Sequence, residues 1–264
     1  FAIVMLLFAY ILGDFFRQVT EMQHALMQRY AWLVIVILWM GSLNFVLPLL
    51  LLKKNMKDLS DGALDAARQR LQPFCPANLV DSDMHMIARY TVETALLLFV
   101  QLFVAPLFWF LLAGGYGLFC YVVLAAAYRQ IIQLGAEKQG YAVTVVRLYR
   151  FFDYLPQKLM YAISMMSLFA APMALPLQAW KNRKNAGKGG LVEGLYVLVS
   201  HGFDFVLGGR YRHVVGPAVE RDWYGSAQAS AKMEAKTLNK VMILLLLNVS
   251  FVAVMVSFLI FYMK

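Results

Sequence analysis

Long stretches without Asp, Glu, Lys or Arg alternate along this chain with dense polar segments. The clearest apolar stretch, residues 241–263, contains no ionisable side chain and is bracketed by Lys240 and Lys264. Residues 30–52 are similar and are followed directly by Lys53. Because a helix rises about 1.5 Å per residue, either stretch can cross a hydrocarbon core of about 30 Å. The pattern predicts a membrane-spanning helix in each.

A helical hairpin is predicted in the middle of the chain. Residues 92–113 carry Glu93 as their only charge, and a second apolar stretch covers residues 116–134. Gly114 and Gly115 lie between the two stretches, and glycine readily adopts the left-handed conformations that tight turns require. We therefore expect two spans joined by a turn at these glycines.

Two further apolar segments leave the topology open. Residues 1–13 are about half a span long, which fits either a partial span or the hydrophobic region of a signal peptide. The chain begins with Phe1 rather than Met, so we expect that the numbering omits its true start. Residues 159–177 contain Pro172 and Pro176, which predicts either a kinked span or a re-entrant segment.

The polar loops, at residues 53–90, 135–158 and 178–240, hold nearly all the Lys and Arg. Loops rich in these residues prefer the cytoplasm, which favours a re-entrant segment at 159–177 and a periplasmic C-terminus. We therefore expect a single membrane domain over residues 1–264, of the all-α class. It should have about 4–6 membrane helices with amphipathic helices in cytoplasmic loops, as a multi-pass protein of a bacterial inner membrane.

One of these amphipathic helices is predicted at residues 58–72. Leu64 and Leu71 share a helical face, and Asp65 precedes Arg68 by three residues, the spacing at which opposite charges attract on a helix. The segment should therefore lie beside the membrane with its apolar side turned inwards.

Composition narrows the classes of partner. Hydrophobic residues make up 61% of the 264 residues, more than in ordinary soluble domains. The net charge of +9 could indicate nucleic acid, but the basic residues flank apolar stretches and no nucleic-acid-binding module is recognisable. We expect a bilayer with anionic headgroups as partner, together with an anionic small ligand or a protein, and no nucleic acid.

Motifs for common cofactors and catalytic sites are absent. Two cysteines and four histidines are too few and too scattered for a zinc site, and there is no dinucleotide fingerprint or nucleophile elbow. We expect no cofactor and no bound metal, and we interpret Cys75 and Cys120 as reduced structural thiols. No acidic cluster within a span marks an ion path, which disfavours a transporter.

Arg89 and Glu93 stand four residues apart where the polar segment meets the predicted hairpin. A carboxylate so close to lipid needs a partner. The pair is either part of an anion or metal site at the mouth of the helix bundle, or an ion pair that anchors the helix end.

Several short motifs, spread over most of the chain, resemble one superfamily of membrane proteins. They are Leu12-Gly13-Asp14, Gly62 to Arg68 with the run to Glu93, Ala105-Pro106-Leu107-Phe108-Trp109 with Gly114-Gly115, Asp153-Tyr154-Leu155-Pro156, Asn185-Ala186-Gly187, Leu207-Gly208-Gly209, and Glu220-Arg221 with Tyr224-Gly225. On these motifs the chain resembles the superfamily that joins the cobalamin-biosynthesis proteins CobD/CbiB to the AmpE proteins.

The CobD/CbiB branch is known as an ATP-dependent ligase that amidates adenosylcobyric acid. Where that branch has acidic and amide residues, this chain has Leu97, Leu98, Gln101, Ala125 and Tyr128. Leucine and alanine can neither coordinate magnesium nor transfer a proton. AmpE proteins similarly lack these acids, so the resemblance is nearer to AmpE.

The resemblance implies a non-catalytic regulatory or accessory protein of the inner membrane, as AmpE is linked to β-lactamase induction during cell-wall recycling. An ATP-dependent amide ligase of cobalamin biosynthesis stays open, because the C-terminal loop retains much of that branch. A subunit of a larger membrane complex is a third hypothesis.

The candidate ligand-binding residues are charged side chains at the bundle mouth, at the proline turn and in the last loop. They are Asp14, Arg89, Glu93, Asp153, Lys158, Arg210, Glu220 and Arg221. We expect no catalytic residue. Each candidate has a structural alternative: Arg210 contacts headgroups, Asp153 caps a helix, and Glu220 pairs with its neighbour Arg221.

Overall fold

The computed structural model describes residues 44–137, 139–182, 191–215, 218–226, 229 and 232–262. Asp14, the predicted span at 1–13 and most of the span at 30–52 lie outside the described residues. The chain divides into two compact units: unit 1 is Phe1–Phe45 with Phe99–Pro156, and unit 2 is Val46–Leu98 with Gln157–Lys264.

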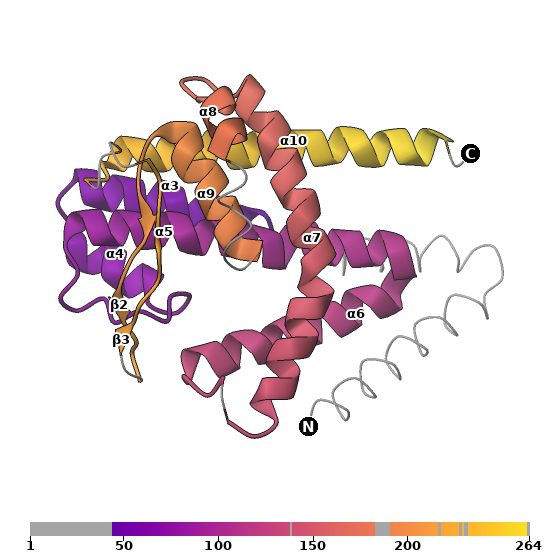
Figure 1. The fold of residues 1–264 in the computed structure, drawn as a ribbon, viewed down its shortest axis with the longest axis horizontal. Helices are drawn as coiled ribbons and strands as arrows, with labels where there is room; N and C mark the ends of the chain where they lie inside the picture. The colour runs from indigo at the N-terminus through magenta and orange to yellow at the C-terminus, as the bar shows by residue number, and fades with distance from the viewer. Residues whose placement is uncertain are drawn as a thin grey trace. The chain divides into compact units, whose positions relative to one another are not determined.

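The described part of the chain is mostly helical, as the sequence predicts. The helices are Val46–Ser60 (α3), Leu64–Leu71 (α4), Met84–Phe99 (α5), Ala105–Gln133 (α6), Ala142–Ala170 (α7), Pro176–Lys181 (α8), Leu191–Phe203 (α9) and Ala235–Tyr262 (α10), and the π-helical turn Val100–Val104 joins α5 to α6 (Figure 1). Because α7 begins at Ala142, much of the predicted polar loop at 135–158 is helical.

Short strands add a feature that the all-α prediction lacks. Leu207–Gly208 (β1) pairs with Trp223–Tyr224 (β4), and Tyr211–Arg212 (β2) pairs with Ala218–Val219 (β3), both antiparallel. All four strands fall within the predicted polar loop at 178–240. They fold this segment of unit 2 into a hairpin-like structure rather than an open connection.

A glycine turn divides the predicted helix at 58–72 into the end of α3 and the whole of α4. Gly62 has φ +74, a left-handed conformation that few other residues tolerate. Within α4, Arg68 Nη1 lies 2.9 Å from Asp65 Oδ1, and Leu71 is fully buried. The predicted ion pair and apolar face are both confirmed.

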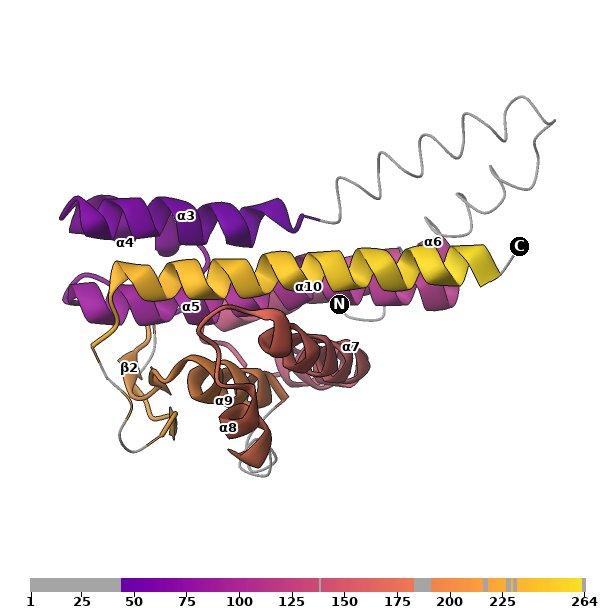
Figure 2. The same ribbon diagram turned by 90° about the horizontal axis from the view of Figure 1, so that it is seen from above.

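Helix α10 covers nearly all of the predicted span at 241–263, and part of it lies beside α3 in unit 2 (Figure 2). Its polar residue Asn248 is fully buried, and Asn248 Nδ2 donates to Ser164 Oγ of α7 at 3.0 Å. A hydrogen bond between apolar helices fixes their register, because neither group finds water there.

Helix α5 begins at an aspartate cap and continues without interruption into α6. Asp83 Oδ1 accepts a hydrogen bond from the Met86 backbone N–H at 2.7 Å. Further along, Pro106 has no N–H to donate, and Ala105 N–H bonds to the Val100 carbonyl five residues back. The proline therefore explains the π-helical turn between α5 and α6.

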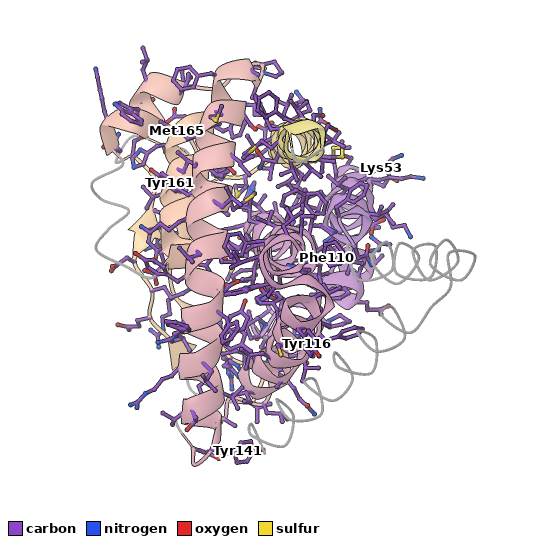
Figure 3. The ribbon with its side chains drawn as sticks, turned by 90° about the vertical axis from the view of Figure 1, so that its right-hand side faces the viewer. Lys53, Phe110, Tyr116, Tyr141, Tyr161 and Met165 are labelled. Carbon is purple, nitrogen blue, oxygen red and sulfur yellow. The ribbon has the colours of Figure 1, made fainter. Side chains whose placement is uncertain are left out.

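Helix α6 consists of two segments that meet at a break. Ala113 has φ −133 and ψ 16, and Gly114 has φ 60 and ψ −148, so both leave the helical conformation. Phe110 and Tyr116 lie on the two sides of the break (Figure 3). The helix thus breaks at the glycines that predict the turn of the hairpin.

Two of the resembled motifs meet inside unit 1. Pro156 lies within α7 and cannot donate a hydrogen bond to the Phe152 carbonyl one turn earlier. Trp109 Nε1 of α6 donates to that oxygen instead, at 3.1 Å, and the Trp109 and Phe152 ring centroids lie 4.9 Å apart. The tryptophan replaces the hydrogen bond that the proline removes.

Trp109→Phe should therefore lower the free energy of unfolding by about 1–3 kcal/mol, because the Phe152 carbonyl would stay buried without a donor. In a Pro156→Ala background the loss should be smaller, since the restored backbone N–H can bond to this carbonyl. Detergent-induced unfolding of the full chain in micelles measures both values. Arg150→Gln, at an exposed residue of α7, serves as control and should change stability by less than about 0.5 kcal/mol. Equal losses in the two backgrounds would refute this explanation.

The prolines of the predicted segment 159–177 do not kink a helix. Helix α7 ends at Ala170, and Pro172 and Pro176 follow it, with Pro176 in the first turn of α8. Proline suits a first helical turn because its missing N–H has no partner there. Whether α7 crosses a bilayer or re-enters it stays a prediction.

The half of α7 that belongs to unit 2 has an unusual distribution of polar side chains. Ala162, Met166 and Phe169 are exposed, whereas Ser164 and Ser167 are fully buried. In a helix at the surface of a water-soluble protein the apolar side chains face inwards. In this half of α7 apolar side chains lie on both sides, because Met160, Ile163 and Leu168 are buried beside the two serines.

Two helical stretches of the described chain are long and apolar enough to cross a membrane. They are Met84–Gln133, which includes the break in α6, and Ala235–Phe258 of α10.

Candidate functional site

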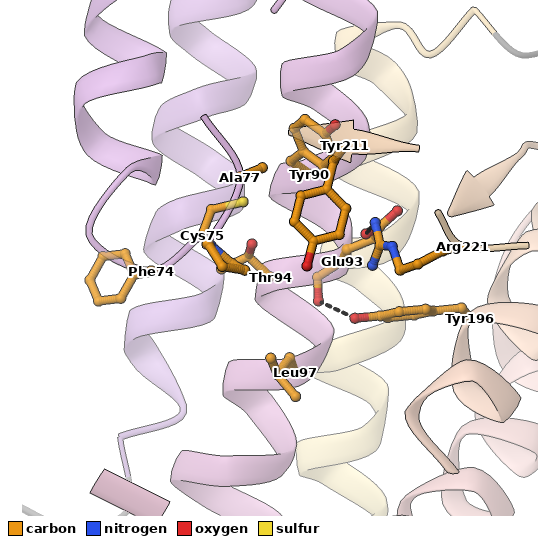
Figure 4. A pocket seen from close by; sticks show the side chains of 11 residues that line it. Phe74, Cys75, Ala77, Tyr90, Glu93, Thr94, Leu97, Tyr196, Tyr211 and Arg221 are labelled. Carbon is orange, nitrogen blue, oxygen red and sulfur yellow. Dashed lines mark hydrogen bonds and ion pairs between the residues drawn. The ribbon is translucent and has the colours of Figure 1, made fainter. Parts of the chain in front are cut away.

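The carboxylate of Glu93, in the middle of α5, accepts hydrogen bonds at both of its oxygens. Glu93 Oε2 accepts a hydrogen bond from Arg221 Nη2 at 2.8 Å, and Glu93 Oε1 accepts one from the Gly208 backbone N–H at 2.8 Å. The Tyr196 hydroxyl of α9 donates to the Glu93 backbone carbonyl at 3.3 Å (Figure 4). Three separate segments of unit 2 therefore hold this one residue.

Gly208 has a conformation and surroundings that exclude other residues. Its φ is +82, and a Cβ atom added there would collide with the Asp222 backbone carbonyl and would lie 2.8 Å from the Tyr224 ring. Gly209 follows with the same φ, and its N–H donates to the Asp222 carbonyl at 3.1 Å. The double glycine lets the backbone turn so that the Gly208 N–H points at the carboxylate.

Arg89 lies one turn before Glu93 on α5 but does not pair with it. The Arg89 guanidinium packs between two rings, 4.8 Å from the Trp223 centroid and 5.3 Å from the Tyr90 centroid. Arg89 is only 7% exposed, and its Nε has no hydrogen-bond partner. Among the residues that the structure describes, no carboxylate forms an ion pair with it.

A cavity of about 80 Å³ lies beside the Glu93–Arg221 pair. Its walls include Tyr90, Tyr211 and Leu97 (Figure 4). This volume accommodates a few water molecules or a small ligand group. The Tyr211 ring also packs against Arg221, with the guanidinium carbon 4.7 Å from the ring centroid.

The electrostatic surroundings keep the Arg221 side chain charged. Burial disfavours the charged guanidinium, but the Glu93 carboxylate together with Tyr196 and Tyr211 outweighs this effect, and the pKa of Arg221 lies above its ordinary value. Nearby, burial raises the pKa of the Tyr224 hydroxyl, and Glu193 raises it further. Arg221 is thus a permanent cation, and Tyr224 stays neutral at physiological pH.

The site lacks an activated nucleophile. Burial raises the pKa of the Cys75 thiol in the cavity wall to about 11, so this thiol is protonated and unreactive at neutral pH. Both Glu93 oxygens already accept hydrogen bonds, so this carboxylate is not poised as a general base. Over the described residues no group of three or more His, Cys, Asp or Glu side chains could hold a metal ion.

Of the predicted site residues, Glu93 and Arg221 pair with each other and line the cavity, whereas Arg89 lies one turn before Glu93 on α5 and packs against Trp223. The alternative in which Arg89 and Glu93 anchor the helix as an ion pair is wrong, because Glu93 pairs with Arg221 instead. The alternative pairing of Glu220 with Arg221 is wrong for the same reason. The buried Arg221–Glu93 pair outcompetes neighbours in sequence because burial strengthens attraction between charges.

The other predicted residues lie elsewhere. Arg210 and Glu220 are exposed around the strands, and Lys158 is exposed on α7. Asp153 does not cap a helix, as its structural alternative supposes, because it lies inside α7 and is fully buried. Asp14 lies outside the described residues.

Asp153 belongs to a polar network within unit 1. Its carboxylate accepts hydrogen bonds from the hydroxyls of Tyr121 at 2.8 Å and Tyr149 at 3.0 Å. Gln101 Nε2 donates to the same Tyr149 hydroxyl at 2.9 Å. Tyr128 stacks on Tyr149 with the ring centroids 3.9 Å apart. Two positions at which the ligase branch has polar residues, Gln101 and Tyr128, therefore take part in packing around one tyrosine.

His201 on α9 links the stability of unit 2 to pH. Burial lowers the pKa of His201 below its ordinary value of 6.5, although Asp204 opposes the shift. The neutral form is favoured in the folded state, so this contribution to stability is complete above about pH 6.5 and decreases as the pH falls below it. We expect the thermal unfolding midpoint to fall between about pH 7 and 5, and to fall less in His201→Gln. Identical pH profiles for the two proteins would contradict this assignment.

Several residues of the site escaped prediction from the sequence, chiefly Gly208, Trp223 and the cavity tyrosines. The double glycine was the available signal, since two adjacent glycines after an apolar helix indicate backbone that other residues cannot adopt. No comparable signal marks Trp223 as a partner of Arg89, because their contact depends on the β1–β4 pairing. No family model, curated protein or solved structure matches this chain.

Proposed function

We propose that this chain is a non-catalytic, multi-pass inner-membrane protein of the CobD/CbiB–AmpE superfamily, nearer to AmpE. It binds an anionic ligand, or an acidic surface of a partner protein, through Arg89 and Arg221. By analogy with AmpE, this binding serves signalling in β-lactamase induction and cell-wall recycling. The observation that carries the proposal is the burial of Arg89 without a carboxylate partner in the described chain.

In the described chain the Arg89 guanidinium has no carboxylate within ion-pair distance. Arg89 and Arg221 supply two guanidinium groups, and Glu93 supplies the carboxylate that pairs with Arg221. A buried cation without a counter-charge costs several kcal/mol, so a bound anion would stabilise the site. Both arginines also have a buried Nε without a hydrogen-bond partner. Guanidinium N–H groups bind carboxylates and phosphates in a bidentate manner, which favours these groups as ligands.

The absence of catalysis is supported by what replaces the acids of the ligase branch. Leu97 lines the cavity beside Glu93, Ala125 is buried in an apolar cluster, and Gln101 bonds to Tyr149. None of these side chains carries the negative charge with which a carboxylate binds magnesium. The positions are filled with packing residues, so the proposal assigns binding rather than ligation to the site.

A membrane location is supported by the exposure of α10 and α7. Only 28% of the most apolar window of α10 is buried, whereas the core helix of a soluble protein would be mostly buried. Val254, Met255 and Phe258 are among its exposed residues. The exposed Met166 and Phe169 of α7 fit the same environment, in which lipid solvates apolar side chains. The proposal includes about 4–6 membrane helices, with the segments expected from the sequence.

Anion binding can be tested on the full-length protein in lipid nanodiscs, with inorganic phosphate and pyrophosphate as probes. We expect thermal stabilisation that saturates with concentration and reaches about 2.7 kcal/mol at a hundredfold excess over Kd. Arg89→Gln should abolish it. The exposed Arg150 gives a matched control, because Arg150→Gln removes the same charge outside the site. Equal stabilisation of both variants, or none of the wild type by either probe, would contradict the proposal.

The topology can be tested with a membrane-impermeant maleimide in intact and permeabilised cells. Gln139→Cys and Glu220→Cys place labels at exposed positions in two of the predicted cytoplasmic loops. Both should react only after permeabilisation. Labelling of one position alone in intact cells would show that the intervening segment crosses the bilayer, which contradicts the re-entrant prediction for residues 159–177.

A further inference from the structure

The segment between α7 and α9 exposes large apolar side chains at a corner of unit 2. Met173 is 78% exposed and Leu177 is 68% exposed. Leu175 and Trp180 are also exposed, and α8 is only six residues long. Scattered exposed apolar residues are ordinary, but a cluster of this kind marks a contact surface.

The backbone beneath this cluster is held firmly to α7 and α9. The Leu175 N–H donates to the Gly202 carbonyl at 2.6 Å. Gly202 packs so closely on α7 that an added Cβ would lie 2.9 Å from Leu168 Cδ2. Ala179 of α8 is buried, whereas its neighbour Trp180 is exposed. The apolar side chains therefore project from a supported backbone, which presents them outwards.

The charges around the cluster favour an anionic surface. Lys181 follows Trp180 directly, and the sequence from 171 to 192 adds further basic residues without a single acidic one. Tryptophan is enriched where the hydrocarbon core meets the headgroups, and basic side chains beside it bind anionic lipid. With six residues, α8 is too short to cross the bilayer, so contact between its apolar residues and lipid would be at the bilayer surface.

We propose that residues 173–181 form an interfacial anchor that binds the surface of a bilayer containing anionic lipid, with Met173, Leu177 and Trp180 inserted below the headgroups and Lys181 among them. This inference rests on the proposed membrane location, and it adds a lipid-binding surface separate from the Arg89 site. The anchor would hold α9, and with it Tyr196 beside Glu93, at a fixed depth relative to the headgroups.

The test measures the depth of nitroxide labels on the full chain in liposomes, from the relative accessibility of each label to oxygen and to a nickel chelate. The label is attached at Leu177→Cys, or at Met173→Cys as a second position, in a background with Cys75→Ala and Cys120→Ala. Val254→Cys on α10 reports lipid, and Asp65→Cys on α4 reports water, since the Asp65 side chain is 85% exposed. Liposomes contain phosphatidylcholine alone, or phosphatidylcholine with phosphatidylglycerol at about three to one.

In the anionic liposomes we expect the oxygen-to-nickel ratio at Leu177 to approach that at Val254 and to exceed that at Asp65 several-fold. Lys181→Gln should lower the equilibrium constant for partitioning of the labelled segment from water into the bilayer by about fivefold. This is the effect of one basic residue at an anionic surface. Omission of phosphatidylglycerol should lower it at least as much. The oxygen-to-nickel ratio at Val254 should be the same in all of these samples.

Each contrary outcome has a distinct meaning. If Leu177 is as accessible to nickel as Asp65 while Val254 is in lipid, the anchor is refuted and the proposed membrane location stands. That result would leave a protein partner as the occupant of the surface. If Leu177 is equally immersed in both liposomes, the dependence on anionic lipid is refuted. If Val254 itself is in water, the proposed membrane location fails.

Discussion

Glu93→Leu should lower the free energy of unfolding by about 3–5 kcal/mol, as expected when one partner of a buried ion pair is removed. The loss has two sources in the structure. Arg221 would keep its charge without the carboxylate, and the Gly208 N–H would lose its acceptor. Detergent-induced unfolding of the full chain in micelles, followed by circular dichroism, measures the effect.

Arg221→Met should lower the free energy of unfolding by a similar amount, because it leaves the Glu93 carboxylate, which is 6% exposed, without its cation. The double variant Glu93→Leu with Arg221→Met should recover part of the loss, since neither charge then remains buried. It should not recover all of it, because Gly208 still lacks an acceptor.

A matched control comes from the exposed pair on α4. Asp65→Asn removes a carboxylate whose side chain is 85% exposed, and it should cost less than about 1 kcal/mol. If Glu93→Leu is no more harmful than this control, the Glu93–Arg221 pair does not hold the site together. If the double variant shows the full sum of the two single losses, the two side chains act independently.

The partner of Glu93 illustrates the limit of sequence reasoning at this site. Arg89 was the nearest opposite charge at helical spacing, and that spacing is the strongest local argument available. Arg221, the actual partner, lies 128 residues away in the chain. Only folding of the β1–β4 region brings it to α5, and two-residue strands give almost no pattern from which to predict them. The resemblance had flagged both residues without indicating that they touch.

The helices were easier to predict where one physical feature dominates the sequence. The charge-free run of α10 and the glycines at the α6 break each define an element without help from distant residues. Most of the polar segment expected at 135–158 is helical, and its charges alone do not indicate this. Arg147 and Arg150 are exposed on α7 while Val145 and Tyr149 are buried, which is a helical alternation within a charged segment.

The resembled motifs gain a physical meaning from their contacts. Trp109 supplies the hydrogen bond that Pro156 removes in unit 1, and Gly208 with Arg221 binds Glu93 in unit 2. In both cases residues far apart in sequence complete one another's hydrogen bonds. Such contacts maintain the fold whether or not a reaction takes place.

Gly208→Ala should lower the free energy of unfolding by about 2–5 kcal/mol. Its φ of +82 costs a non-glycine residue about 1–2 kcal/mol, and the collision of the new methyl group with the Asp222 carbonyl adds about 1–3 kcal/mol. Because the clash pushes β1 away from β4, the Gly208 N–H should also move from Glu93. Arg89 packs on Trp223 of β4, so the stabilisation by phosphate should weaken in the same variant.

Gly62→Ala separates the cost of the positive φ from the cost of the steric clash. Gly62 has φ +74, close to that of Gly208, but no atom lies within 4 Å of an added Cβ. This variant should therefore show the backbone cost alone, about 1–2 kcal/mol, with phosphate binding unchanged. The difference between the two variants measures how tightly the β1–β4 pair is packed at Gly208. If Gly208→Ala lowers the free energy of unfolding no more than Gly62→Ala does, the β1–β4 pair accommodates the new methyl group without strain. The position of the Gly208 N–H then does not depend on a glycine.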